Sequence, residues 1–249
     1  MGESFGDYIL GDDKSVVRYI TSSNIACGFH ASDPNVMAKT VALCKEHNVM
    51  IGAHPGYPDL LGFGRRFMDV NEQDLINYII YQTGALKGFL DFYGMPMQHI
   101  KTHGALYNYL VNEEKLFMSI VEHVKRVFPD AVFLTLGTKR TTELKKTCIK
   151  KGIKIALEAF PDRMYTDEGE LLPRKFKEAV LHDKELIATR AKRIVKERGI
   201  ESVNGRWIEM DIDTLCIHGD NAESIEAAKR IRESLEREGV QIKNLASFI

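Results

Sequence analysis

The stretch Val49-Met50-Ile51-Gly52-Ala53-His54 is an apolar run of strand length that ends on a histidine. Four other runs of the chain have the same form and also end on polar, chemically capable side chains. After a loop, each is followed by a segment with helical periodicity. Repeated strand–helix units are typical of a parallel sheet. The other four runs are residues 23–30, 97–103, 153–158 and 215–220.

The ends of these runs predict one active site. In parallel α/β folds the C-terminal ends of the strands form a common rim, where side chains from distant parts of the chain converge on a ligand. We therefore expect the polar side chains that end the runs to share one cavity at that rim. These are His54, Lys101, His103, Glu158 and His218.

The length of 249 residues suits one large α/β domain, because barrels of this kind run to about 250 residues as a single unit. No linker, low-complexity tract or repeat divides the chain, so we predict a single domain over residues 1–249 with six or seven β/α units. The expected helices cover residues 34–47, 71–92, 116–127, 138–151, 184–198 and 222–237.

Charge and composition argue against several classes of partner. Thirty-four basic and thirty-five acidic residues give a net charge of −1, so neither nucleic acid nor an anionic membrane is expected. No apolar stretch approaches the roughly 20 residues needed to span a bilayer, and the N-terminus has no signal-peptide profile. The four cysteines form no C-x-x-C pair, so a disulfide framework is not expected and the chain is predicted to be cytoplasmic.

Three residues on the second and third runs are the strongest catalytic candidates. His54 precedes Pro55 in a glycine-rich turn, which suits a general base or a metal ligand, although a loop histidine bonded to backbone would look the same. Lys101 and His103 are two residues apart and point to the same side if both are extended. A buried lysine there needs an anion, unless it faces a helix and extends outward to solvent.

The remaining strand ends leave the role of each residue open. His30 is equally consistent with function and with structure. His218 and Asp220 resemble a base and its orienting carboxylate, although Asp220 could merely cap the following helix. Tyr107 and Asn108 could bond a substrate, or Tyr107 could be a packing residue.

Two long loops follow strand ends and are candidate covers for the rim. The loop over residues 55–66 carries Asp59 and the neighbouring pair Arg65 and Arg66, whose guanidinium groups suit a carboxylate or a phosphate. The loop over residues 161–173 carries Arg163. Phosphate-loop, Rossmann, H-E-x-x-H and G-x-S-x-G motifs are absent, which argues against zinc metalloproteases and serine hydrolases.

Taken together, these strings resemble the LamB/YcsF family, usually described as the A subunit of bacterial and archaeal 5-oxoprolinase. The match covers almost the whole chain in the right order and adds Glu3 and Asn24 to the candidate substrate-binding residues. The matching strings are residues 2–6, 23–31, 51–59, 62–66, 103–108, 162–163, 172–174 and 216–220.

The resemblance implies a fold and an activity. The fold is a distorted (β/α) barrel of the glycoside hydrolase/deacetylase kind. The activity is the ATP-dependent opening of the 5-oxoproline lactam to glutamate, with two partner subunits, B and C, and magnesium expected with the ATP. His54 or His103 would be the base that activates water, with Glu158 or Asp220 orienting it. Lys101, Arg65 and Arg66 would hold phosphate or the substrate carboxylate.

The start of the chain departs from the family pattern. Family members usually carry an Asp-Leu-Asn-x-Asp strand just before the Gly-Glu-Ser-Phe-Gly string, whereas this sequence begins at Met1. We therefore expect the first strand of the barrel to be missing. An open edge should then lie beside the strand over residues 23–29, with Glu3 near the gap.

Two other functions compete with this interpretation. One is a metal-dependent hydrolase or deacetylase acting alone, which His30, His54, His103 and His218 would permit. The other is a non-catalytic scaffold, which would have no need of histidines at successive strand ends.

Overall fold

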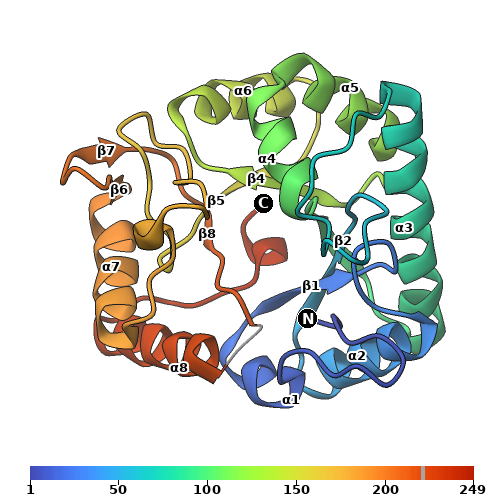
Figure 1. Cartoon of the computed structure of the whole chain (residues 1–249), viewed down its shortest axis with the longest axis horizontal. Coiled ribbons are helices and arrows are strands. Elements are labelled where there is room, and N and C mark those ends of the chain that lie inside the picture. Colours follow the sequence, from blue (N-terminus) through green and yellow to red (C-terminus); the bar gives the residue numbers. More distant parts are fainter. Residues whose placement is uncertain (220–221) are drawn as a thin grey trace.

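A computed structural model describes residues 1–219 and 222–249. Within these residues, six parallel strands form one curled sheet in the order β1-β2-β3-β4-β5-β8. Figure 1 shows the sheet curving around a centre, with α2, α3, α5, α6, α7 and α8 outside it. The strands are β1 (Ser22–Ala26), β2 (Met50–His54), β3 (Met97–Ile100), β4 (Val132–Leu136), β5 (Ile155–Ala159) and β8 (Thr214–Leu215).

The helices begin and end where local sequence signals place them. Asp33 caps α2 by accepting hydrogen bonds from two backbone N–H groups, and Pro34 is the first helical residue. Asn71 caps α3 in the same way, and Gly94 ends it in the left-handed conformation. The principal helices are α2 (Pro34–Glu46), α3 (Glu72–Tyr93), α5 (Glu114–Lys125), α6 (Lys139–Lys150), α7 (Lys184–Glu197) and α8 (Ala222–Arg237).

Four short elements were not expected from the sequence. Helix α4 (Gly104–Asn112) directly follows the third strand, and the short helix α1 (Asp13–Val16) precedes the first. The strands β6 (Gly199–Glu201) and β7 (Trp207–Glu209) form an antiparallel pair outside the main sheet. Helix α1 and the strands β6 and β7 have only three or four residues each. Helix α4 is longer but lacks the capping residue and the regular apolar spacing that predict a helix. All four elements are stabilised by their tertiary contacts.

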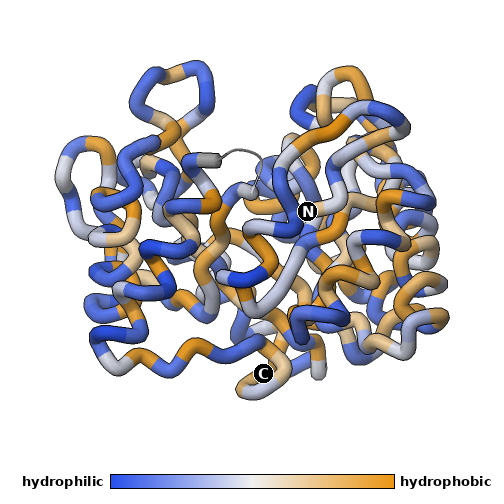
Figure 2. Tube along the Cα trace, turned by 90° about the horizontal axis from the view of Figure 1, so that it is seen from below, coloured by the Kyte–Doolittle hydropathy of each residue, from blue (hydrophilic) through white to orange (hydrophobic). Residues whose placement is uncertain are grey.

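The hydrophobic core lies between the sheet and the helices. Strands β4 and β5 are buried along their whole length, as expected for parallel strands covered on both faces. The C-terminal segment covers the sheet at the end opposite the long loops, where Leu245 packs on Val132, Leu134 and Ala156. In the side view of Figure 2 the C-terminus accordingly lies opposite the long loops.

Over residues 1–219 and 222–249 the sheet does not close, in agreement with the expected open edge. Strands β1 and β8 are its two edges and are not paired with each other. Met1 makes strand-like bonds to β1: its amino group donates to the Asn24 carbonyl at 2.8 Å, and its own carbonyl accepts from Ala26 at 3.1 Å. Glu3, two residues further on, is half-buried near this edge.

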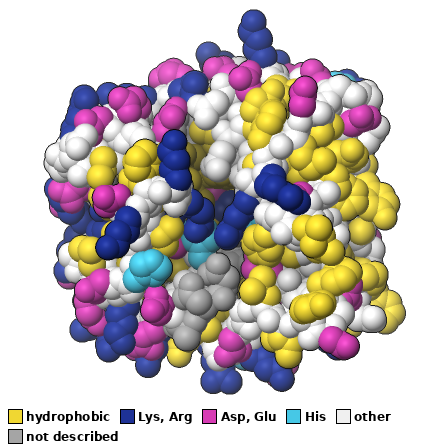
Figure 3. All heavy atoms as spheres, in the orientation of Figure 1, with side chains coloured by type: hydrophobic (Ala, Val, Ile, Leu, Met, Phe, Trp, Pro, Cys, Tyr) yellow, Lys and Arg dark blue, Asp and Glu magenta, His cyan; other side chains and the backbone are white. Residues whose placement is uncertain are grey.

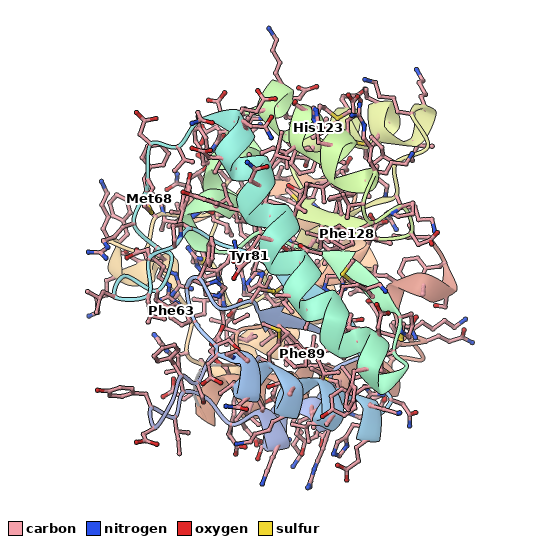
Figure 4. All side chains as sticks on the ribbon, turned by 90° about the vertical axis from the view of Figure 1, so that its right-hand side faces the viewer. Phe63, Met68, Tyr81, Phe89, His123 and Phe128 are labelled. Carbon is pink, nitrogen blue, oxygen red and sulfur yellow. The ribbon has the colours of Figure 1, made fainter. Side chains whose placement is uncertain are left out.

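The long loop between β2 and α3 lies at one end of α3. Figure 4 shows Phe63 and Met68 on this loop, with Tyr81 and Phe89 along the helix. The ring of Phe63 on this loop lies 5.7 Å from that of His30, which follows β1. The loops after the first two strands therefore pack together above the carboxyl end of the sheet.

Candidate active site

His54 and His103 meet at the carboxyl ends of neighbouring strands. The β2–β3 ladder continues past β3, because Lys101 N–H donates to the Ala53 carbonyl at 2.9 Å and His103 N–H donates to the Pro55 carbonyl at 2.8 Å. Lys101 and His103 are therefore both extended, as the spacing required. The two histidine rings lie with His54 Nε2 and His103 Nδ1 3.1 Å apart, so the structure brings this predicted pair together.

His30 joins this pair as a third ring. It stacks on His103 with ring centroids 3.7 Å apart and planes 5° from parallel. His30 is fully buried, and neither of its ring nitrogens has a hydrogen-bond partner among the described residues. Gly64 lies directly over both rings with φ +61°, and a Cβ there would lie 2.8 Å from each side chain. The loop over residues 55–66 thus covers the histidines closely.

Lys101 forms a buried ion pair with Glu158. Its Nζ donates to Glu158 Oε2 at 2.8 Å and to Cys216 Sγ at 3.1 Å, and it lies 4.7 Å from the centre of the Phe160 ring. Burial acts to lower the pKa of Lys101, but the Cys216 sulfur and the Glu158 carboxylate outweigh it and raise that pKa. Because Glu158 is bonded to Lys101, it does not orient a histidine, and that expectation was wrong.

Tyr107 lies on α4 against this ion pair, with Lys101 Nζ 5.4 Å from the centre of its ring. Burial, followed by the nearby Glu158 carboxylate, raises the pKa of Tyr107 well above its usual range. The phenol therefore stays protonated at neutral pH. Asn108, the next residue, is exposed on the same helix.

Asp162 orients His218. Its Oδ2 lies 2.6 Å from His218 Nδ1, and Arg174 Nη2 lies 3.1 Å from His218 Nε2. A guanidinium can only donate and a carboxylate only accepts, so Nδ1 carries the proton and Nε2 has the lone pair. Burial acts to raise the pKa of Asp162, but His218 outweighs it and lowers that pKa. Asp162 is thus an orienting carboxylate that the sequence reasoning missed, although it follows a strand end.

Asp220, the orienting carboxylate that was predicted instead, lies outside the described residues. His218 also stacks on Phe160, which in turn contacts Lys101. This ring connects the Asp162–His218 pair to the Lys101–Glu158 pair. Lys101, Glu158 and His218 are therefore linked through side chains, and the His54–His103 pair joins them through the backbone, because His54 Nδ1 lies 2.7 Å from the Lys101 carbonyl oxygen.

Two of the predicted anion-binding residues have structural partners. Arg66 forms an ion pair with Asp59, and Asp59 also accepts from Gly62 N–H at 2.9 Å. This pair stabilises the loop over residues 55–66. Arg163 is buried and donates to the carbonyls of Ala179 and Leu172, which holds together the second long loop.

Arg65, which also has an interaction partner, lies at the mouth of the site. It is exposed, with its guanidinium 5.0 Å from the centre of the Phe63 ring. Burial, and to a smaller extent the charge of Arg65, lowers the pKa values of His30 and His103. In Figure 3 Lys, Arg and His side chains gather around a hollow in the middle of this face.

Asn24 lies apart from the cluster of His30, His54 and His103, at the open edge of the sheet. Its Oδ1 accepts from His99 Nε2 at 2.7 Å, and both residues line a cavity of about 550 Å³ between β1 and β8. Glu158 and Cys216 also line this cavity, so it reaches the ion pair from the open edge of the sheet.

The described residues contain no group of three or more His, Cys, Asp or Glu side chains arranged to hold a metal ion. His54 and His103 direct their ring nitrogens at backbone carbonyl groups or at each other, whereas neither ring nitrogen of His30 has a hydrogen-bond partner among the described residues. Among the helices of residues 1–219 and 222–249, none is both long and apolar enough to cross a membrane.

Comparison with known proteins identifies the family to which the chain belongs. The model of the LamB/YcsF family matches residues 1–249. The chain belongs to the LamB/YcsF family. This LamB/YcsF chain is 49% identical to a Pyrococcus abyssi protein named as the A subunit of 5-oxoprolinase, over all of this chain and 96% of that protein. A Campylobacter jejuni protein of the same name is 45% identical over the same shares.

A solved structure agrees with the family fold. The lactam utilization protein from Thermus thermophilus superimposes with a TM-score of 0.88 at 38% identity, covering 98% of this chain and 96% of that one. The expected distorted (β/α) barrel is therefore confirmed as a single curled parallel sheet covered by helices.

Proposed function

We propose that this chain is the A subunit of an ATP-dependent 5-oxoprolinase, which opens 5-oxo-L-proline to L-glutamate together with partner subunits B and C. Support comes from whole-length similarity to proteins named as the A subunit of 5-oxoprolinase. The observation that carries the chemistry is the Asp162–His218 pair, which presents a histidine lone pair at a positively charged mouth.

The reaction needs a base for water. A five-membered lactam is a resonance-stabilised amide, and transfer of the terminal phosphoryl group of ATP to its oxygen would activate the carbonyl carbon. Water then attacks that carbon and must lose a proton. His218 Nε2 is suited to accept this proton, because Asp162 holds the ring and stabilises the imidazolium that forms. Arg174, now on Nε2, would move to the developing anion.

The reaction also needs cations and a proton donor. Arg65 and Arg174 are the guanidinium groups proposed to hold a substrate carboxylate or the phosphates of magnesium-bound ATP in exchange for their present partners, while Lys101 stays on Glu158. The ring nitrogen must gain a proton as its bond to carbon breaks. This cleavage leaves the phosphoryl group on the new carboxyl as an acyl phosphate, and a second water hydrolyses it to glutamate and inorganic phosphate. His54 and His103, at the base of the site, are the groups proposed to supply the proton of the ring nitrogen.

The test uses the chain assembled with subunits B and C, with glutamate release and ATP hydrolysis measured on one preparation. We expect His218→Asn to lower glutamate formation by roughly 10²–10⁴-fold, the usual cost of losing a positioned base. His123→Asn is the control, because His123 lies on the outer helix α5 and bonds the Ser119 carbonyl of the same helix. No 5-oxoproline-dependent glutamate release from the parent assembly would contradict the proposed function.

A further inference from the structure

A second cavity lies at the amino ends of the strands, on the opposite side of the sheet's rim from the proposed active site. Its volume is about 490 Å³, and stretches of chain that are far apart in the sequence form its walls. They are the turn before β1, the end of α2, helix α8 and the C-terminal segment, which lies opposite the long loops in Figure 2. The polar lining residues are Arg18, Thr21, His47, Asn48, Arg232, Lys243, Asn244 and Ser247.

The charged groups in this cavity have one sign. Arg18, Arg232 and Lys243 contribute cations from three separate parts of the chain. Among the described residues that line the cavity, none is an aspartate or a glutamate. Because like charges repel, gathering three cations around one cavity is unfavourable unless an anion compensates them.

Two of these cations are unpaired within residues 1–219 and 222–249. The side chains of Arg18 and Lys243 make no ion pair and no hydrogen bond there. Arg232 is compensated in part, because its Nε lies 3.0 Å from Glu236 Oε1 and its Nη1 donates to the Tyr19 carbonyl at 3.4 Å. This second contact also brings the Arg232 guanidinium next to the residue that follows Arg18, while Nη2 keeps both of its N–H groups for a ligand.

This combination of groups suits a phosphate. A guanidinium offers parallel N–H donors that match two phosphate oxygens, and a lysine adds a compact charge. Side-chain amides and hydroxyls around the cations add neutral hydrogen-bond donors. A concave site of this volume fits a small molecule, whereas a nucleic-acid binder needs an extended basic face that a chain of net charge −1 does not favour.

We propose that the cavity lined by Arg18, Arg232 and Lys243 binds a small phosphate-bearing anion at a second ligand site, remote from the histidines of the proposed active site. Its place in the fold gives the anion a structural effect. Arg18 precedes β1, whereas Arg232 and Lys243 follow β8, and these two strands are the unpaired edges of the described sheet. An anion held from both sides therefore ties together two edges that no ladder hydrogen bond joins.

The test is thermal unfolding of the full chain at constant ionic strength, with inorganic phosphate or pyrophosphate as the probe and sodium chloride as the reference. A probe at about 100 times its Kd should raise the thermal midpoint by roughly 5–10 °C. Pyrophosphate should act at lower concentration than phosphate, because its larger charge is attracted more strongly by the three cations. Calorimetric titration with each probe gives its Kd and should show one site per chain.

The variants Arg18→Gln and Lys243→Gln should each weaken pyrophosphate binding by roughly 10–100-fold, the usual loss for a hydrogen bond to a charged group. Without a probe, neither variant should lower the midpoint, because each removes repulsion between cations. Arg126→Gln and Lys150→Gln are the matched controls. Both are exposed cations that make no ion pair in the described part of the chain and do not line this cavity.

The outcomes decide the proposal and the source of the phosphate. Weakened binding in the two cavity variants, with normal binding in the controls, would support the site. A response to both probes would then assign it to free phosphate, and a response to pyrophosphate alone to a molecule carrying linked phosphates. Equal midpoints in phosphate, pyrophosphate and chloride would overturn the proposal, as would binding that survives in the double variant Arg18→Gln, Lys243→Gln. None of these results depends on the proposed function, since neither 5-oxoproline nor a partner subunit is present.

Discussion

His103 is the residue on which most contacts of the site converge. Its ring bonds His54 and the Phe63 carbonyl, stacks on His30 and lies under Gly64. A histidine held this tightly combines a structural role with a chemical one. The two roles make different predictions for its removal.

We predict that His103→Ala, assembled with both partner subunits, abolishes glutamate formation while the fold and partner binding remain. Loss of a positioned acid–base group costs roughly 10²–10⁴-fold in rate. Glutamate release, ATP hydrolysis and the thermal midpoint are measured on the same preparation. Near-normal turnover with a lowered midpoint would instead assign His103 a purely structural role.

Three neighbouring strands are linked across one face of the sheet by a single side chain. Asn24 of β1, Gly52 of β2 and His99 of β3 are in register, and the His99 ring passes over Gly52 to reach Asn24. A Cβ at position 52 would lie only 2.1 Å from this ring. Glycine is therefore required here by the close approach of a side chain from the adjacent strand.

Gly52→Ala should accordingly lower the free energy of unfolding by about 1–3 kcal/mol, the usual cost of overpacking a filled site. The measurement is urea unfolding at neutral pH. Gly84→Ala on α3 is the matched control: a Cβ there meets nothing, and alanine in a helix should raise stability by about 0.5–1 kcal/mol. Equal effects at the two positions would contradict the account of Gly52.

His30, His99 and His103 are buried, His54 is half-buried, and the pKa values of all four are lowered. Burial lowers the pKa values of His99 and His103 to about 3 and those of His30 and His54 well below normal. In the unfolded chain each would titrate near 6.5. The unfolded state therefore binds more protons, and the stability from the neutral rings is complete above about pH 6.5 and falls below it.

We predict that, without added anions, the free energy of unfolding falls as the pH is lowered from neutral. The slope should approach about 1.4 kcal/mol per pH unit for each buried histidine. Urea unfolding over a pH series measures it. His99→Gln should reduce the slope by the share of one histidine, and the exposed control His182→Gln should leave it unchanged. A slope that His99→Gln leaves unaltered would contradict this assignment.

The open edge is the second property of the whole molecule. Met1 already pairs with β1, and a cavity of about 550 Å³ lies between β1 and β8. An Asp-Leu-Asn-x-Asp segment added before Met1 should extend this pairing and raise the thermal midpoint, because each hydrogen bond formed contributes about 0.5–1.5 kcal/mol. An extension of equal length with alternate prolines, which lack the N–H group, should not. Equal midpoints for the two extensions would contradict strand addition.

Much of the architecture was predictable because its signals are local. The apolar runs, the Asp33 and Asn71 caps and the alternation of strands with helices each depend on residues close in the chain. Parallel strands bring their carboxyl ends to one rim, so the convergence of His54, Lys101 and His103 followed directly from that pattern.

The tertiary structure alone decided which polar group meets which. Glu158 pairs with Lys101, 57 residues away, and Asp162 with His218, 56 residues away. Arg66 turns back to Asp59 within its own loop, while Arg65 stays at the mouth. No local pattern specifies these partners, because they depend on strand order, on loop paths and on which charges must be compensated once they are buried.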